Sequence, residues 1–357
     1  MLSANINLGI IPDYSKTKEE VYEDFVRRHI ESSQRLDILA LCELQNSSSD
    51  LPTWVPDLSV PKLALNLCVG EACGRSRHEG SFSNTDKGLH LCGVYAGAIK
   101  YVGNSVPHTA MLSEILALCR SWEISGTLVG NYSGGCTAPD AYLKTIVCGW
   151  IKDDIPPASG AAPTMEECRS SFSSLLQQGC VNRTNHNFAY WMSRCLRGRA
   201  FCTTSQGHIG VFPAAVQAGD QICIALGCNT PLLLRPVLGH NTYYRLVGEC
   251  YVNGLMDSEV LLGSLPSSWK RGQTDNNGNR VYIDGYKNPT LEDPRLGPLP
   301  QGWRKYHKGG HEFDEVGNFS DFGFENVEAG SETRVDPRLT KDALIKRGMD
   351  VMDFIVI

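Results

Sequence analysis

The hydrophobic pattern changes its period at Gly198, and this change constrains the fold more than any other feature of the chain. Between residues 108 and 197, four stretches carry apolar residues at helical spacing. After Gly198, short apolar runs such as "RAFCTTSQGHIGVFP" and "DQICIALG" are separated by turn residues, with one hairpin turn at Gln206-Gly207. The pattern predicts an α+β fold, in which a helical region leads into a small antiparallel β-barrel or sheet.

Two helix starts carry an explicit signal. Thr17 is followed three residues later by Glu20, and Thr164 by Glu167, which is the capping-box spacing. A second short helix, "LDILALCEL", follows the first and is expected to be capped by Asp37. The segment "LPTWVPDLS" is expected to be extended with Trp54 packed inward, and "GLHLCGVYAGAIKYVG" to be a strand or hairpin. Loops near 69–88 and 125–138 are rich in Gly and Ser and are expected to be mobile.

A chain of 357 residues exceeds the usual size of a single core, which favours several units. We expect a mainly helical region at 1–197, an antiparallel β domain at 198–264, small β-hairpin repeats at 265–298 and 299–340, and a helix–strand tail at 341–357. Thr340 should cap the tail helix, Gly348 should end it, and the final "DFIVI" should pair with strands already folded.

The composition argues against several classes of partner. The net charge is −6, whereas a protein that binds nucleic acid usually carries a basic surface. No stretch approaches the roughly 20 apolar residues of a membrane-spanning helix, and the N-terminus lacks the pattern of a signal peptide. We therefore expect a cytoplasmic protein that binds neither nucleic acid nor membrane. The oligomeric state cannot be read from the sequence.

The fourteen cysteines do not form a recognisable site. They show neither a Cys-x-x-Cys pair nor a Cys/His cluster with zinc spacing. Two glycines between His307 and His311 argue against a helix that would align these histidines for a metal ion. In "QICIALGC", Cys223 lies on an apolar strand and Cys228 in the turn after it, so both are expected to fill the core. The sequence does not show whether His208 lies near these thiols in the folded chain. The sequence predicts no catalytic residue, no metal site and no cofactor.

Four separated blocks carry a family likeness. In order, they are "IIPDYSKTKEEVYEDFVRRHIESSQRLDILALCEL", "LPTWVPDLS", "GRAFCTTSQGHIGVFPAAVQAGDQICIALGCNTPLLLRP" and "YRLVGECYVNGLMDSE". In this order they resemble the region downstream of the HET domain in fungal heterokaryon-incompatibility (HET) proteins. The resemblance implies a role in non-self recognition when unlike fungal cells fuse. The HET module itself would stand ahead of Ile10, so it is either lost or outside this sequence, and we carry over no effector chemistry.

Residues 265–300 resemble a WW domain. The matching parts are Leu265-Pro266, Trp269, the Asn277-Gly278 turn, Tyr282 and Asp293-Pro294-Arg295. The resemblance implies that Trp269 packs on Pro294 as a structural buckle. It also implies that Tyr282 and a second Trp grip a proline-rich peptide, but Leu291 stands in the place of that Trp.

Residues 299–340 repeat the pattern more loosely. They match at Leu299-Pro300, Trp303, Asn326 and Asp336-Pro337-Arg338, and Arg334 replaces the second Trp. The resemblance therefore makes Tyr282 and Trp303 candidate partner contacts, with Trp269, Pro294 and Pro337 as structural residues. The other interpretation is that both repeats serve only as scaffold.

Three functional hypotheses follow. The first is an accessory or regulatory region of a HET-family protein that acts by protein–protein contact, with exposed aromatic residues near the barrel or the repeats. The second is an enzyme with a thiol or acid/base site in a cleft between helices and barrel, which needs a histidine within hydrogen-bond reach of a Cys or a carboxylate. The third is an inactive, truncated HET paralogue.

Overall fold

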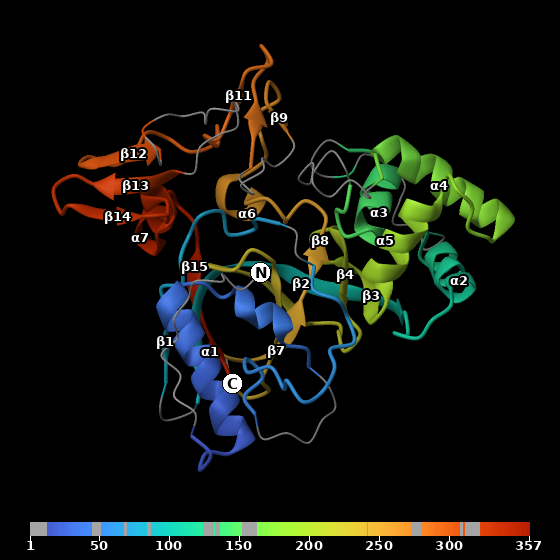
Figure 1. Cartoon of the computed structure of the whole chain (residues 1–357), viewed down its shortest axis with the longest axis horizontal. Helices are drawn as coiled ribbons and strands as arrows, with labels where there is room; N and C mark the ends of the chain where they lie inside the picture. Colours follow the sequence, from blue (N-terminus) through green and yellow to red (C-terminus); the bar gives the residue numbers. More distant parts are fainter. Residues whose placement is uncertain are drawn as a thin grey trace.

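A ring of five strands forms the centre of the molecule, seen in the computed structural model of the chain (Figure 1). The structure describes residues 13–44, 51–67, 70–83, 87–123, 132, 136–151, 163–240, 242–272, 280–307, 310 and 322–357. The ring runs β2 (Leu89–Ser105), β5 (Gln221–Ala225), β6 (Leu232–Pro236), β7 (Tyr243–Glu249) and β15 (Val351–Val356), and β15 returns to β2. The predicted α+β class is therefore confirmed.

Strand β2 is long enough to serve two sheets. Its first half pairs with β15 and β5, and its second half pairs with β3 (Arg199–Thr204). From β3 the sheet continues through β4 (Ile209–Pro213) to β8 (Tyr251–Val252), while β1 (Ser81–Phe82) lies beside the start of β2. The predicted hairpin between β3 and β4 is confirmed, and Gly207 adopts a φ of +86° in its turn.

The last strand closes the ring of five strands into a β-barrel. In β15, Val351–Val356 pair antiparallel with Val94–Leu89, and Ile355 and Val356 pair parallel with Tyr243 and Tyr244 of β7. The expectation that the C-terminal strand docks on a folded sheet is thus confirmed. The strands of the barrel come from three parts of the sequence, because β2 and β15 lie far from the segment 198–264.

Two helical groups cover the barrel. Alternate residues of all five ring strands share one core with Val26 and Ile30 of α1 (Lys18–Ser33) and with Trp54, which is fully buried as predicted. The other group consists of α2 (Leu112–Glu123), α3 (Ala138–Ile146), α4 (Met165–Gln178) and α5 (His186–Leu196). It packs on β3 and β4 through Phe201 and Val211, on the side away from the repeats (Figure 1).

The two predicted capping boxes are present at α1 and α4. The second short helix differs from the prediction, because Asp37–Leu41 form a 3₁₀ helix (η1) and Asp37 does not cap it. Instead, the Asp37 carboxylate accepts hydrogen bonds from the Arg35 side chain and from the backbone N–H of Asn229. A four-residue helix, α6 (Glu259–Leu262), leads from β8 to the C-terminal repeats.

The repeats are two three-stranded antiparallel sheets. One contains β9 (Lys270–Arg271), β10 (Tyr282–Ile283) and β11 (Pro289–Thr290), and the other contains β12 (Trp303–His307), β13 (Phe322–Asn326) and β14 (Ser331–Thr333). The chain returns to the barrel through η2 (Pro337–Leu339) and α7 (Lys341–Lys346). Thr340 caps α7 as predicted, whereas Arg347 is its C-cap and Gly348, with a φ of +85°, follows one residue later.

The segment 70–80 is packed, although its composition predicts a mobile loop. Ala72, Cys73 and Ser76 are buried. The backbone N–H of Ala72 donates to the carbonyl of Asn229, and that of His78 donates to the carbonyl of Gln34. These bonds tie the segment to the barrel, and backbone groups satisfied in this way remove the main reason for mobility. Most of the second predicted loop, 125–138, lies outside the described residues.

Candidate functional site

Each C-terminal repeat begins with the same local turn. The backbone N–H of Trp269 donates to the carbonyl of Pro266 over 2.9 Å, and that of Trp303 donates to the carbonyl of Pro300 over 3.1 Å. In both cases the sequence is Leu-Pro-x-x-Trp, so one local conformation follows from one pattern. The two segments therefore share this opening turn.

A buried arginine ties the end of the first repeat to its beginning. The Arg295 Nε and Nη2 atoms donate to both oxygens of Asp293, over 2.9 and 2.6 Å. Its Nη1 atom donates over 2.8 Å to the carbonyl of Gly263, just before the Leu-Pro turn. Burial raises the pKa of Asp293, but the hydrogen bonds and charge of Arg295 outweigh burial and hold the pKa below its usual value. The pair therefore stays ionised and closes the repeat.

The second repeat contains the same arrangement. Arg338 binds both oxygens of Asp336 over 2.9 and 2.7 Å, and its Nη1 atom donates over 2.8 Å to the carbonyl of Gly297. The Arg338 Nη2 atom also lies 3.3 Å from Glu292 of the first repeat. The part of the repeated signal that sequence reasoning missed is the Gly two residues before Leu-Pro, whose carbonyl is the partner of the Arg of Asp-Pro-Arg.

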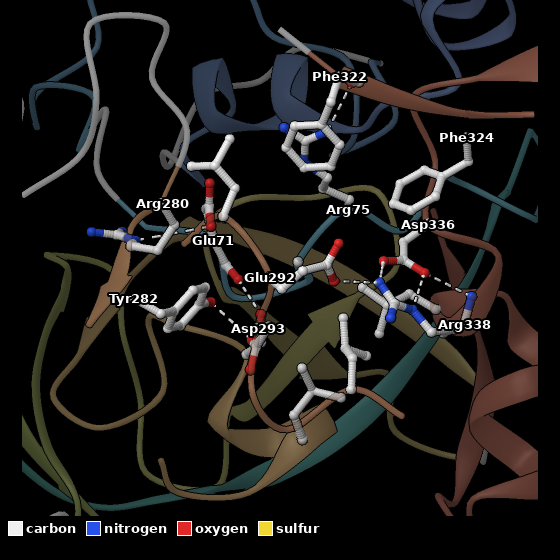
Figure 2. Close-up of a pocket in the computed structure, with 16 residues that line it drawn as sticks. Glu71, Arg75, Arg280, Tyr282, Glu292, Asp293, Phe322, Phe324, Asp336 and Arg338 are labelled. Atoms are coloured by element: carbon white, nitrogen blue, oxygen red, sulfur yellow. Dashed lines mark hydrogen bonds and ion pairs between the residues drawn. The ribbon is translucent and has the colours of Figure 1, made fainter. Parts of the chain in front are cut away.

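A pocket lies between the two repeats, α6 and the packed segment 70–80 (Figure 2). About 520 Å³ of space there, open solvent at its mouth included, is not filled by atoms. Its lining residues come from four parts of the chain: Glu71, Gly74, Arg75, Ser258, Leu262, Arg280, Tyr282, Leu291, Glu292, Asp293, Leu296, Phe322, Phe324, Asp336, Arg338 and Leu339. The pocket combines aromatic and leucine walls with paired charges, which suits binding of a side chain better than bond-making chemistry.

The two positions that would form the WW peptide slot of the first repeat face this junction. Tyr282 is 7% exposed, and its hydroxyl donates to Asp293 over 2.8 Å. Burial raises the pKa of Tyr282 well above its usual value. Leu291 shares a small core with Phe322 and Phe324 of the second repeat, and Trp303 packs half-buried against that core. The neighbouring repeat therefore packs on the Leu291 position of the slot, and Asp293 of the same repeat binds the Tyr282 hydroxyl.

The residues expected to be structural occupy different environments. Pro337 is buried at the start of η2, whereas Trp269 and Pro294 are half-buried. Packing of Trp269 on Pro294 stays a prediction from the resemblance. The Asn277-Gly278 turn lies outside the described residues.

An ion network connects the first repeat to the barrel. Asp257, at the end of the barrel region, pairs with Arg271 and, over 2.9 Å, with Arg280. Burial opposes ionisation of Asp257, but the charges of Arg271 and Arg280 outweigh it and lower its pKa. Arg280 Nε lies 3.9 Å from Glu71, which is the longest of these ion pairs. These charges neutralise one another and serve to dock the repeat.

Four thiols of the barrel region are in environments that disfavour the thiolate. Cys223 and Cys228 are buried in the barrel core, as predicted, and burial raises the pKa of both thiols. Burial likewise raises the pKa of Cys42 to about 12 and that of Cys92 to about 11. A nucleophilic cysteine needs a lowered pKa and access to solvent, so these thiols act as small apolar side chains.

Thiol alkylation tests this interpretation. At pH 8 we expect Cys180, which is exposed, to react quickly with a maleimide, whereas Cys223 and Cys228 react orders of magnitude more slowly because they become accessible only on unfolding. Peptide mapping by mass spectrometry identifies the sites, and all fourteen cysteines should react in denaturant. Rapid labelling of Cys223 in the native protein would revive the enzyme hypothesis.

His208 and Cys228 lie in different surroundings. Cys228 packs beside Leu36, whereas His208 lies in the β3–β4 turn with its ring 6.3 Å from that of Tyr132. Burial lowers the pKa of His208, so the imidazole is neutral near pH 7. Among the described residues, no cluster of His, Cys, Asp or Glu is suited to hold a metal ion. His311 lies outside them.

Comparison with known proteins finds one family model and one curated relative that each match part of the chain. Residues 175–264 match the family model of the Het-6 beta-barrel domain, a range that ends just before the first repeat. "Heterokaryon incompatibility protein 6, OR allele" of Neurospora crassa is 38% identical over 74 residues. The aligned part is 20% of this chain and 11% of that relative, so the match spans about a tenth of the relative's length. In the described part of the chain, no helix has the length and apolar character of a membrane-spanning segment.

Proposed function

We propose that this chain is an accessory part of fungal non-self recognition and that it acts by contact with another protein. Its relationship to the fungal heterokaryon-incompatibility family supports the proposal. The relative's role in heterokaryon incompatibility supports the biological setting. We propose the cytoplasm as the compartment. The exposed surface of this chain supports the contact.

The observation that carries the proposal is a run of exposed aliphatic side chains. Leu58, Val60, Leu63 and Leu65 are 53%, 37%, 39% and 45% exposed. We call these four residues the apolar ridge. Single exposed apolar residues are common on protein surfaces, whereas a contiguous apolar patch marks an interaction surface, and we propose that these four residues form one.

The ridge is held firmly from beneath. Lys62, which lies between its members, donates to the carbonyl of Ala40 over 2.5 Å and pairs with Glu249 over 3.1 Å. Ala64 is 2% exposed, and the backbone N–H of Leu67 donates to Glu249 over 2.9 Å. Anchors thus flank Leu63 and Leu65 within residues 62–67, so little conformational entropy would be lost when a partner covers this part of the ridge.

Exposed tyrosines give the proposal a secondary support and a control. Tyr95 and Tyr101 on β2 are 39% and 48% exposed, and Tyr286 in the β10–β11 turn is 89% exposed. Tyr95 and Tyr101 lie on the barrel, where the contact hypothesis expects aromatic residues, and Tyr286 serves as the control. Tyr286 is outside the apolar ridge, so its substitution changes a different surface.

A paired substitution tests the proposal. We expect the double variant Leu58→Ser, Leu65→Ser to lose the incompatibility reaction when strains that carry it are fused with incompatible strains. The reason is that truncating buried interface anchors typically costs a large share of the binding energy. Cell death in the fused compartments is the measurement, at protein levels matched by immunoblot. Tyr286→Ser is the control and should retain the reaction, whereas full activity of the double variant would contradict the ridge contact.

A further inference from the structure

The aromatic face of the second repeat already holds a guanidinium group. The Arg75 Cζ atom lies 3.7 Å from the centroid of the Phe322 ring, and its Nη1 atom donates to the Phe322 carbonyl over 3.3 Å (Figure 2). The Lys305 ammonium lies 4.1 Å from the same ring centroid. Arg75 comes from the packed segment 70–80, almost 250 residues earlier in the sequence. The contact therefore resembles a ligand bound by the repeat, supplied by the same chain.

The backbone around Arg75 is fixed, whereas its side chain is only half-buried. The backbone N–H of Asp336 donates to the Arg75 carbonyl over 3.0 Å. The next residue, Ser76, is 1% exposed and accepts a hydrogen bond from Gly227 over 3.0 Å. Arg75 can therefore leave Phe322 by a change of rotamer, without undocking of the segment.

The pocket beside Phe322 would accept a second basic side chain or the displaced one. Glu292 points toward its centre in Figure 2, and its side chain is 44% exposed although it pairs with Lys305 over 2.8 Å and with Arg338 over 3.3 Å. The Glu71 side chain is 33% exposed, and its ion pair with Arg280 is long at 3.9 Å. Both carboxylates lie on the wall of the same pocket as Phe322. The site thus joins an aromatic face to two accessible carboxylates, which is the chemistry that recognises a guanidinium.

We propose that this face of the second repeat is a receptor for an arginine side chain presented by an extended segment of a partner protein, and that Arg75 occupies it in cis until the partner displaces it. Arginine suits the site better than lysine, because a planar guanidinium stacks on Phe322 while it donates to the Phe322 carbonyl. The inference builds on the proposed contact function by giving the partner a chemistry. It uses a surface distinct from the apolar ridge, so the two can fail separately.

The test uses the full chain and the peptide acetyl-Gly-Arg-Ser-amide, which copies residues 74–76. Binding is measured by NMR titration to native protein, to Arg75→Ala and to the control Arg304→Ala, whose arginine pairs with Glu325 on the same sheet and is 64% exposed. We expect Arg75→Ala to bind the peptide about tenfold more tightly than native protein or the control, the scale of one well-placed cation–π contact. Replacing the peptide's arginine by lysine should weaken binding, and adding Phe322→Leu to Arg75→Ala should abolish it.

Two results would overturn the proposal. One is equal affinity of native protein and Arg75→Ala, which would mean that Arg75 does not occupy the site. The other is no binding to folded Arg75→Ala. If Arg75→Ala does not fold, Arg75→Gln replaces it, since this variant keeps most of the side-chain length without the charge, and the same outcomes apply. The ridge residues are intact in all of these variants, so a negative result leaves the proposed ridge contact standing.

Discussion

Replacing Phe354 by alanine is expected to lower the free energy of unfolding by about 3–5 kcal/mol, the usual cost of truncating a buried aromatic residue. Phe354 is 1% exposed in β15, and its ring lies 5.3 Å from that of Tyr244 on β7. It also pairs in register with Leu91 of β2. The cavity would therefore open at the seam where the last strand closes the barrel. Urea denaturation followed by circular dichroism measures the loss.

Met352→Ala is the matched control for this seam. Met352 lies in the same strand and is 40% exposed, so its truncation should cost less than about 1 kcal/mol. Equal effects of the two substitutions would show that β15 does not contribute a specific side chain to the core. A large difference would support the conclusion that the barrel depends on a strand more than 100 residues beyond β7.

Glu249→Gln should be the second severe substitution. Glu249 and Arg199 are each 1% exposed and lie 3.7 Å apart, and Glu249 also pairs with Lys62. Removing the carboxylate leaves a buried guanidinium without its counter-charge, and breaking a buried pair in this way typically costs about 3–5 kcal/mol. Thermal unfolding and urea titration of the variant measure the effect.

The double variant Glu249→Leu, Arg199→Met provides the comparison. Replacing both charges by apolar side chains removes the buried unpaired charge, so we expect the double variant to be more stable than Glu249→Gln alone. A double variant that is less stable than the single one would mean that the hydrogen bonds of Arg199 to Cys195 and Leu65, rather than its charge pair, dominate the site.

Local signals in the sequence predicted local structure well. The capping boxes at Thr17 and Thr164, the turn at Gln206-Gly207 and the cap at Thr340 each depend on residues within a few positions of one another, and the structure contains all four. The packed segment 70–80 was missed because its order comes from backbone bonds to Gln34 and Asn229, which are distant in sequence. Its glycines and serines carry no sign of these partners.

The candidate site depended on pairings that a single sequence does not reveal. The resemblance to WW domains pointed to Tyr282 as a contact residue, and Tyr282 does line the pocket. Its hydroxyl donates to Asp293, a pairing that depends on how the first repeat folds and that the sequence does not reveal. Arg75 had no signal of its own, because its partner Phe322 is supplied by the far end of the chain.

Photo-crosslinking at Val60 tests the central claim most directly. A benzoylphenylalanine placed at Val60, in the middle of the apolar ridge, should form an adduct with one partner protein during an incompatibility reaction, whereas the same group placed at Tyr286 should not. Mass spectrometry of the adduct identifies the partner. We expect a single adduct at Val60, and we expect it to disappear when Leu58 and Leu65 are replaced by serine. A Val60 probe that crosslinks to no specific protein while the reaction proceeds normally would contradict it.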